Sequence, residues 1–148
     1  MPAWIASGFD EYARRMPREM PLALIELKPE PRHDNPGSTA AARTLENEAR
    51  RVEAAIPRGA QRVVLDESGS TVTTRQLAQR MARWRESGQD VAFIIGGADG
   101  TAARLKSDAH WLWSLSPLTL PHGLVRVVLV EQLYRAASIL AHHPYHRV

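Results

Sequence analysis

The chain ends in a cluster of side chains that could bind a metal ion or RNA. Its last seven residues hold three histidines together with Tyr145 and Arg147. His142 and His146 are four residues apart, but Pro144 breaks the helix that would align them, which argues against a metal site. RNA contact is a second interpretation, with Tyr145 stacking on a base and Arg147 gripping a phosphate. A terminus without a role is the third.

A glycine-rich turn is the second candidate for chemistry. Residues 96–100 have the sequence GGADG and directly follow the apolar run VAFII. Glycines at such a point let a ligand approach the backbone closely. The spacing fits neither the dinucleotide fingerprint nor the Walker A loop, which needs a lysine followed by serine or threonine. A tight turn from strand to helix without a ligand therefore stays open as an alternative.

A loop of small polar and apolar residues is the third candidate. Residues 114–122, SLSPLTLPH, contain two prolines that restrict the backbone. Such a loop can offer backbone N–H and C=O groups to an adenine, with Leu118 and Leu120 as walls. The alternative is a loop that fills the core, with His122 as a cap or packing residue of the next helix.

Short apolar runs alternate with helical patterns along the chain, which predicts an α/β fold with a mainly parallel sheet flanked by helices. The run VAFII lacks polar alternation and is expected to be covered on both faces. We expect loops over Pro29–Ser38 and Glu67–Val72. The predicted strands are Leu22–Lys28, Arg62–Asp66, Val91–Ile95 and Trp111–Leu115. The predicted helices are Pro2–Met16, Thr39–Ile56, Arg75–Ser87 (capped by Thr73 or Thr74 and ended by Gly88), Ala102–Ala109 and His122–Ala141.

Three of these strands end in residues suited to a ligand. The first ends at Leu65 and Asp66, the second at Gly96 and Gly97, and the third at Leu115. Ligands of open parallel sheets bind outside the carboxyl ends of the strands. The sequence therefore predicts one pocket built from three loops.

Composition excludes several classes of protein. The chain has no cysteine, which rules out a disulfide framework, a thiolate zinc site and a cysteine nucleophile. Its 17 arginines and 2 lysines give a net charge of +3, which permits nucleic-acid binding without demanding it.

No secretion signal is visible, and charges within the apolar segment 123–140 argue against a membrane span, so we expect a cytoplasmic protein. The wide apolar surface of that segment predicts either a homodimer or burial within one chain.

Four ordered blocks carry a family resemblance. The stretches VVLDESG, FIIGGADG, WSLSPLTLPHGLVRVVLVEQLYRA and HHPYHR together resemble the RlmH family of SPOUT-class methyltransferases. The resemblance spans nearly the whole chain and implies a single domain over residues 1–148 with an α/β trefoil knot. It also implies a homodimer packed on the final helix. The implied activity is methyl transfer from S-adenosyl-L-methionine to N3 of a pseudouridine in the 23S RNA of the assembled ribosome, with no DNA or membrane partner.

The resemblance also assigns roles to residues. Catalysis would involve His122 or His146 as the base that removes the N3 proton, together with Tyr145 and Arg147. Arg126, Tyr145 and Arg147 would contact RNA. The implied cofactor residues are Leu65, Gly96, Gly97, Leu115, Ser116, Pro117, Leu118, Thr119 and Leu120.

One feature departs from the family pattern. Family members begin with an apolar strand before an MP-x-W segment, whereas this chain starts at Met1-Pro2-Ala3-Trp4. We therefore expect the sheet to lack the family's first strand and the chain to be less stable than a longer relative. Two further hypotheses stay open: a non-catalytic ribosome-associated RNA-binding protein of the same fold, and a small-molecule nucleotide enzyme on a flavodoxin-like sheet.

Overall fold

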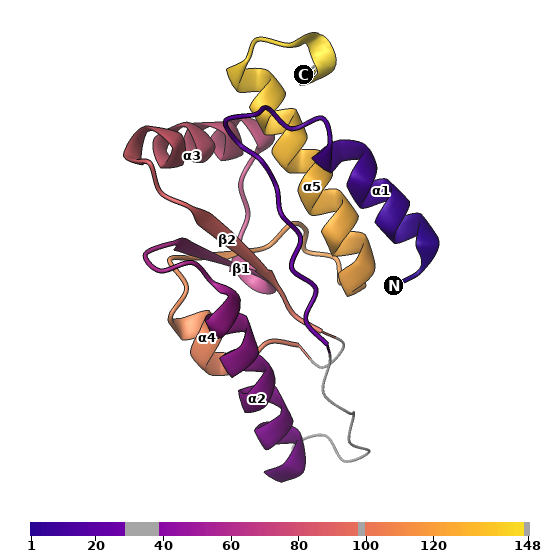
Figure 1. The fold of residues 1–148 in the computed structure, drawn as a ribbon, viewed down its shortest axis with the longest axis vertical. Helices are drawn as coiled ribbons and strands as arrows, with labels where there is room; N and C mark the ends of the chain where they lie inside the picture. The colour runs from indigo at the N-terminus through magenta and orange to yellow at the C-terminus, as the bar shows by residue number, and fades with distance from the viewer. Residues whose placement is uncertain (29–38, 98–99, 147–148) are drawn as a thin grey trace.

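The computed structural model describes residues 1–28, 39–97 and 100–146. They form a parallel sheet of order β2-β1-β3 flanked by helices, which confirms the predicted α/β fold (Figure 1). The loop expected over Pro29–Ser38 lies outside the described residues, and the trefoil knot stays a prediction. The elements in chain order are α1 (Ala3–Ala13), α2 (Thr39–Ala55), β1 (Gln61–Ser70), α3 (Thr74–Ser87), β2 (Val91–Ile95), α4 (Ala103–Ser107), β3 (Trp111–Trp113), α5 (His122–Leu140) and the 3-10 turn η1 (Pro144–His146).

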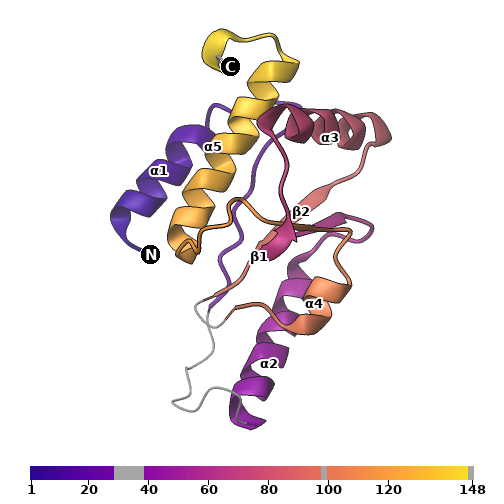
Figure 2. The same ribbon diagram turned by 180° about the vertical axis from the view of Figure 1, so that it is seen from behind.

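The sheet lies between two layers of helices. Helices α1, α3 and α5 cover one face, and α2 and α4 cover the other (Figures 1 and 2). Strand alternation points Val63 and Leu65 toward α3 and α5, and Val64 toward α2 and α4. Strand β2 lies at the edge of the sheet, and only Ile94 of its five residues is buried, so it is less covered than its apolar sequence predicts. The main core on the α3 and α5 side contains Val63, Leu65, Leu77, Met81, Trp111, Trp113, Leu129 and Leu133.

Local signals define the helices well. All five predicted helices are present, and their ends fall within three residues of the predicted positions. At the start of α3, the Thr73 hydroxyl accepts a hydrogen bond from the Gln76 backbone, and the Gln76 side chain accepts one from the Thr73 backbone. At its end, Gly88 adopts the left-handed conformation, with φ 69°. Such a cap stabilises a helix by about 1 kcal/mol.

The segment Leu22–Lys28 is not a strand, so that prediction is wrong. Figure 1 shows it as an irregular tube that runs past β2. Its alternation predicted a buried face, yet Leu24 is 47% and Ile25 is 59% exposed. A strand needs a neighbouring backbone for its N–H and C=O groups, and within the described residues none pairs with this segment. A side-chain contact holds it instead, because Glu26 pairs with Arg126 of α5 at 3.4 Å.

Strand β1 continues through part of the predicted loop Glu67–Val72, which corrects that boundary. Leu65 and Ser70 both pair with Trp113, so the four residues between them bulge out of the ladder. The bulge closes where Gly69 passes β3, because a Cβ there would lie 2.4 Å from the carbonyl oxygen of Leu112. Only glycine allows this approach of two backbones. Strand β3 is also shorter than predicted and ends at Trp113.

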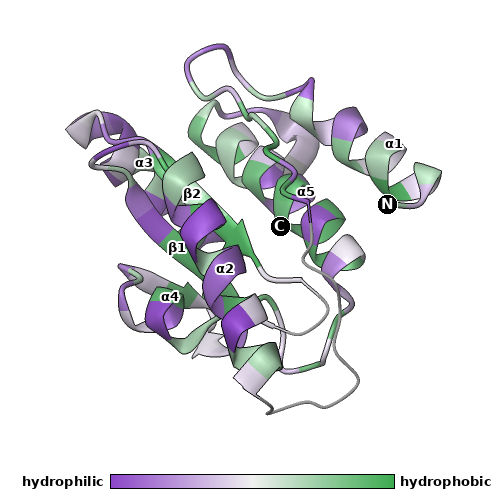
Figure 3. Cartoon of the chain, turned by 60° about the horizontal axis from the view of Figure 1, so that its bottom comes forward, coloured by the Kyte–Doolittle hydropathy of each residue, from purple (hydrophilic) through white to green (hydrophobic). Residues whose placement is uncertain are grey.

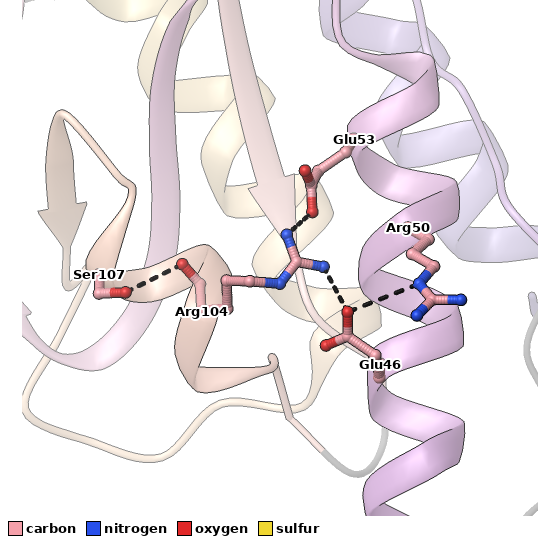
Figure 4. Close-up of polar contacts among 5 residues, drawn as sticks. All are labelled: Glu46, Arg50, Glu53, Arg104 and Ser107. Atoms are coloured by element: carbon pink, nitrogen blue, oxygen red, sulfur yellow. Dashed lines mark hydrogen bonds and ion pairs between the residues drawn. The ribbon is translucent and has the colours of Figure 1, made fainter.

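Ion pairs join the two helices on the far face of the sheet. The guanidinium of Arg104 on α4 contacts Glu53 and lies 2.8 Å from Glu46, both on α2 (Figure 4). Arg50 approaches the same Glu46 oxygen at 3.6 Å. These side chains are partly exposed, so each pair contributes little on its own. Together these ion pairs nevertheless fix α4 against α2.

Helix α5 is largely covered within the chain. It packs between α1 and α3, and Leu129, Val130 and Leu133 are buried. Gly123 at its start touches α1, since a Cβ there would lie 2.2 Å from the side chain of Ile5. In Figure 3 green segments of the strands lie between the helices, while α2 alternates purple and pale turns. Internal burial thus accounts for much of the apolar surface of α5. None of the helices within the described residues combines the length and apolar character that crossing a membrane requires.

Candidate functional site

The three strands end in one row. Leu65 pairs with Ile95 on one side and with Trp113 on the other. The residues that follow, from Asp66, Gly96 and the loop after β3, therefore emerge at the same edge of the sheet. This confirms that the three strand ends predicted from the sequence converge. The side chain of Leu65 belongs to the core, so what it can offer a ligand is its backbone.

The turn after Leu65 is fixed by Asp66. Its carboxylate accepts hydrogen bonds from the backbone and the hydroxyl of Ser68, and Lys106 of α4 lies 3.1 Å away. Burial acts to raise the pKa of Asp66, but the hydrogen bonds from Ser68 and Lys106 outweigh it and hold that pKa below its ordinary value. The β1 turn and α4 are thus joined by a carboxylate that stays ionised at neutral pH.

The loop between β3 and α5 is ordered by its own side chains. Ser114 donates its hydroxyl to the carbonyl of Ser116 at 2.8 Å, and the Ser116 hydroxyl accepts from the Leu118 backbone at 3.0 Å. Thr119 donates to a carboxylate oxygen of Glu67 in the β1 turn at 2.9 Å. Figure 2 shows this orange segment crossing the edge of the sheet to reach α5. The loop is therefore tied to the neighbouring strand end before any ligand binds.

The side chains of this loop differ in exposure. Leu115, Ser116 and Leu120 are half-buried, whereas Pro117 and Thr119 are exposed. Leu118, predicted to be a wall of a binding site, is 72% exposed. The apolar surface available at this edge thus includes Leu115 and Leu120, with Leu118 open to solvent.

The glycine turn after β2 is tight at one position. A Cβ at Gly96 would lie 2.4 Å from the hydroxyl oxygen of Thr101 and 3.0 Å from the backbone of Gly100. Gly100 has φ 86° and donates its N–H to the carbonyl of Gly97 at 3.0 Å. A Cβ at Gly97 would meet no atom within 4 Å. The turn therefore requires glycine at position 96 for packing and at position 100 for conformation.

His122 and Arg126 begin α5 beside these loops. His122 is exposed and follows Pro121, which makes no side-chain cap. Both terminal nitrogens of Arg126 lie 3.4 Å from one oxygen of Glu26, and its side chain is only 13% exposed. In this conformation Arg126 is paired within the chain, and the role in RNA binding predicted for it would require Glu26 to move aside.

Tyr145 of the tail packs against the C-terminal half of α5. Tyr145 donates a hydrogen bond to Glu131 at 3.3 Å, and its ring lies 4.7 Å from that of Tyr134. Burial, followed by contacts with Tyr12 and Glu131, raises the pKa of Tyr145 to about 12. Glu131 and Tyr134 lie about 14 and 18 Å along α5 from His122. Within one chain, Tyr145 is thus remote from His122.

His146 belongs to η1, and Arg147 lies outside the described residues. The structure therefore gathers the predicted cofactor residues and His122 at one edge, but within the described residues it does not bring Tyr145 to that edge. The roles assigned to Tyr145, His146 and Arg147 stay predictions.

Sequence reasoning missed several side chains that shape this edge. Asp66 was predicted as a strand end and Glu67 directly follows it, but the partners of both side chains lie far along the chain and were not predicted. Lys106 reaches Asp66 only because α4 packs beside β1, and Thr101 closes on Gly96 only because the turn folds back. Such contacts depend on tertiary structure.

Comparison with known proteins agrees with this geometry. The family model described as "Predicted SPOUT methyltransferase" matches residues 1–146. The chain is 58% identical over 147 residues to proteins named "Ribosomal RNA large subunit methyltransferase H" from Burkholderia mallei (strain SAVP1) and Burkholderia pseudomallei (strain 668). Each alignment covers 99% of this chain and 92% of the relative. The match extends over the strand ends, the loops and α5 alike, and this chain belongs to the SPOUT methyltransferase family.

Proposed function

We propose that this protein is an S-adenosyl-L-methionine-dependent methyltransferase that modifies N3 of a pseudouridine in large-subunit ribosomal RNA. The observation that carries the proposal is the 58% identity to relatives named for ribosomal RNA methylation, which extends over 99% of the chain. The convergence of Leu65, Ile95 and Trp113 in one row supports it, because ligands of parallel sheets bind at this edge.

The residues at the edge fit the cofactor. A nucleoside needs an apolar wall and backbone groups that approach closely, and the edge offers Leu115, Leu120 and the tight turn at Gly96. The backbone of Leu65 and residues 115–120 would hold the adenosine, and the turn at Gly96 and Gly97 would hold the rest. When bound, S-adenosyl-L-methionine supplies an activated methyl group. The hydrogen bonds within the loop reduce the ordering that binding demands.

The chain's own chemical task is to position the base and to remove one proton. As the bond between the methyl carbon and N3 forms, the carbon–sulfur bond breaks and the N3 proton must leave. His122 is exposed at the same edge and an imidazole can accept a proton as a general base, so we assign it as a candidate base, with His146 as the alternative. Holding donor and acceptor in line supplies much of the rate.

The assembly belongs to the same proposal. We propose that the protein acts as a homodimer on the assembled ribosome in the cytoplasm, with α5 at the interface and the family's trefoil knot around the cofactor site. Tyr145 and Arg147 would then contact RNA, Tyr145 by stacking and Arg147 through a phosphate. Arg126 would join them once it is released from Glu26.

The proposal is tested by calorimetric titration of the purified chain with S-adenosyl-L-methionine, followed by transfer of labelled methyl groups to bacterial large subunits and whole ribosomes. We expect saturable binding and incorporation at one pseudouridine. His122→Ala and His146→Ala are measured alongside, and full turnover by both would refute the base assignment. Binding to ribosomes without methyl transfer would instead indicate the non-catalytic RNA-binding alternative.

A further inference from the structure

A cavity lies between the end of β1 and the side of α3, and none of the residues that line it is a proposed cofactor residue. Its volume is about 380 Å³. The short connection from β1 to α3, visible in Figure 2, forms one wall, and α3 forms the other. The lining residues are Ser70, Thr71, Val72, Gln76, Gln79, Arg80 and Arg83.

The cavity is positively charged. Arg80 and Arg83 are its two charged residues, and no carboxylate lines it. They lie three residues apart and therefore share one face of α3. Within the part of the chain that the structure describes, neither forms an ion pair. Both guanidinium groups can therefore receive an anion from outside the chain.

Arg80 is held in a fixed orientation. Its guanidinium carbon lies 4.0 Å from the centre of the Trp111 ring. Trp111 is itself rigid, because its side chain donates to the Ser70 hydroxyl at 2.9 Å and its ring stacks on Trp113 with centres 4.6 Å apart. Stacking leaves the N–H edge of a guanidinium free for hydrogen bonds. Little conformational entropy is then lost when that edge binds an acceptor.

The remaining lining groups suit a phosphate. Hydroxyls of Ser70 and Thr71 can donate to phosphate oxygens, and two guanidinium groups match the acceptors of a phosphodiester. The side-chain oxygen of Gln76 already accepts from the Thr73 backbone at 2.8 Å, so its amide nitrogen remains to donate. The volume suits a group of nucleotide size.

We infer that this cavity binds a backbone phosphate of the RNA substrate, outside the reacting nucleotide. The inference rests on the proposed function, since that function supplies RNA as the ligand. The position is suitable, because the Ser70 carbonyl accepts from the Ser114 backbone at 3.0 Å and Ser114 begins the proposed cofactor loop. The cavity therefore adjoins the reacting edge and acts on RNA affinity and register, with no part in methyl transfer itself.

The test replaces each arginine by glutamine. Arg83→Gln removes an exposed charge, and Arg80→Gln removes the stacked one. Arg85→Gln is the matched control, because it removes the same charge from the same helix, about 200° around the axis from Arg83 and outside the cavity. Affinity is measured for a short labelled oligouridylate and for bacterial large subunits over a series of salt concentrations. Binding of S-adenosyl-L-methionine and thermal unfolding are recorded for every variant.

We expect both cavity variants to bind the oligouridylate several-fold more weakly than Arg85→Gln. The slope of log affinity against log salt should fall by about 0.7 for each phosphate that the variant no longer neutralises. Methyl transfer to ribosomes should show a raised KM and an unchanged kcat, and cofactor binding should be unaffected. If Arg80→Gln lowers the thermal stability, Arg83→Gln alone decides the question, because its side chain is exposed.

Three results would overturn the assignment. The first is an equal loss of oligouridylate affinity in all three variants. The second is no binding of the oligouridylate by the wild type. The third is a loss of affinity for large subunits alone, which would indicate that the cavity binds ribosomal protein. The proposed function fails separately. If the protein binds RNA through Arg80 and Arg83 but transfers no methyl group, the assignment of the cavity stands and the proposed enzymatic function is refuted. If methyl transfer is unchanged by both arginine substitutions, the proposed function stands and the role of the cavity is refuted.

Discussion

At the residue scale, the two adjacent glycines after β2 have different reasons to be glycine. Gly96 is packed against Thr101 and the backbone of Gly100, whereas Gly97 has open space where a side chain would stand. The sequence pattern GGADG predicted a tight turn but could not separate the two positions, because the atoms that surround Gly96 arrive only when the turn closes. The same limit applies to Asp66, whose partner Lys106 is forty residues away in sequence.

We predict that Gly96→Ala lowers the free energy of unfolding by about 1–3 kcal/mol, because its Cβ overlaps neighbouring atoms. Gly97→Ala is the matched control and should change it by less than about 0.5 kcal/mol. Urea denaturation followed by tryptophan fluorescence measures both. Equal effects of the two substitutions would show that the turn is not packed as described. Cofactor titration of Gly96→Ala should also show weaker binding.

We predict that the stabilisation by Asp66 depends on pH. Because its pKa is lower in the folded protein than in the unfolded chain, its contribution is complete above the ordinary value of about 3.9 and is lost as pH falls through the folded value. At neutral pH, Asp66→Asn should be about 1 kcal/mol less stable than the wild type. The two proteins should converge in acid. Thermal unfolding across pH provides the measurement, and a gap independent of pH would contradict the assignment.

At the element scale, helices were predictable and strand boundaries were less so. Helix α3 carries its own start and stop at Thr73 and Gly88, so local sequence suffices. A strand depends on its neighbour. The alternation in Leu22–Lys28 is genuine, but in the described structure no strand pairs with it. Conversely, the polar residues after Leu65 predict a loop, although the ladder resumes at Ser70 through its bond with Ser114.

We predict that Gly69→Ala disrupts the pairing of β1 with β3. Its Cβ would lie 2.4 Å from the Leu112 carbonyl oxygen, and a backbone atom in a sheet cannot turn aside as a flexible side chain can. The expected loss in the free energy of unfolding is about 3 kcal/mol or more. Gly97→Ala again serves as the control in urea denaturation. A loss below about 1 kcal/mol would mean that the two backbones lie further apart than described.

At the scale of the whole molecule, the convergence of the strand ends followed from the alternation of strands and helices, which fixes the direction of a parallel sheet. The position of the tail did not follow from the sequence pattern. The family resemblance implied a catalytic role for the tail, yet within one chain Tyr145 packs against Glu131 and Tyr134 of α5, away from His122. The sequence contains the length of that helix, but only the packing of α5 between α1 and α3 sets its direction.

The proposed knot makes a prediction about folding. Threading must carry the C-terminal segment through a loop, so a stable domain fused after Val148 should slow refolding several-fold. The same domain fused before Met1 is the control and should leave the rate nearly unchanged. The chain's 4 tryptophans report refolding after dilution from urea. Equal rates for both fusions would argue against threading from the C-terminus.

The separation of His122 and Tyr145 along α5 determines which subunit supplies each of them to an active site. If His122 and Tyr145 serve a single reaction, they must come from different copies of the chain, since within one chain Tyr145 lies against Glu131 and Tyr134, about 14 to 18 Å along α5 from His122. Each active site is then formed by residues of both subunits. A chain with His122→Ala and a chain that lacks residues 142–148, each inactive alone, should regain methyl transfer when they are unfolded and refolded together, because mixed pairs hold one intact combination of ends.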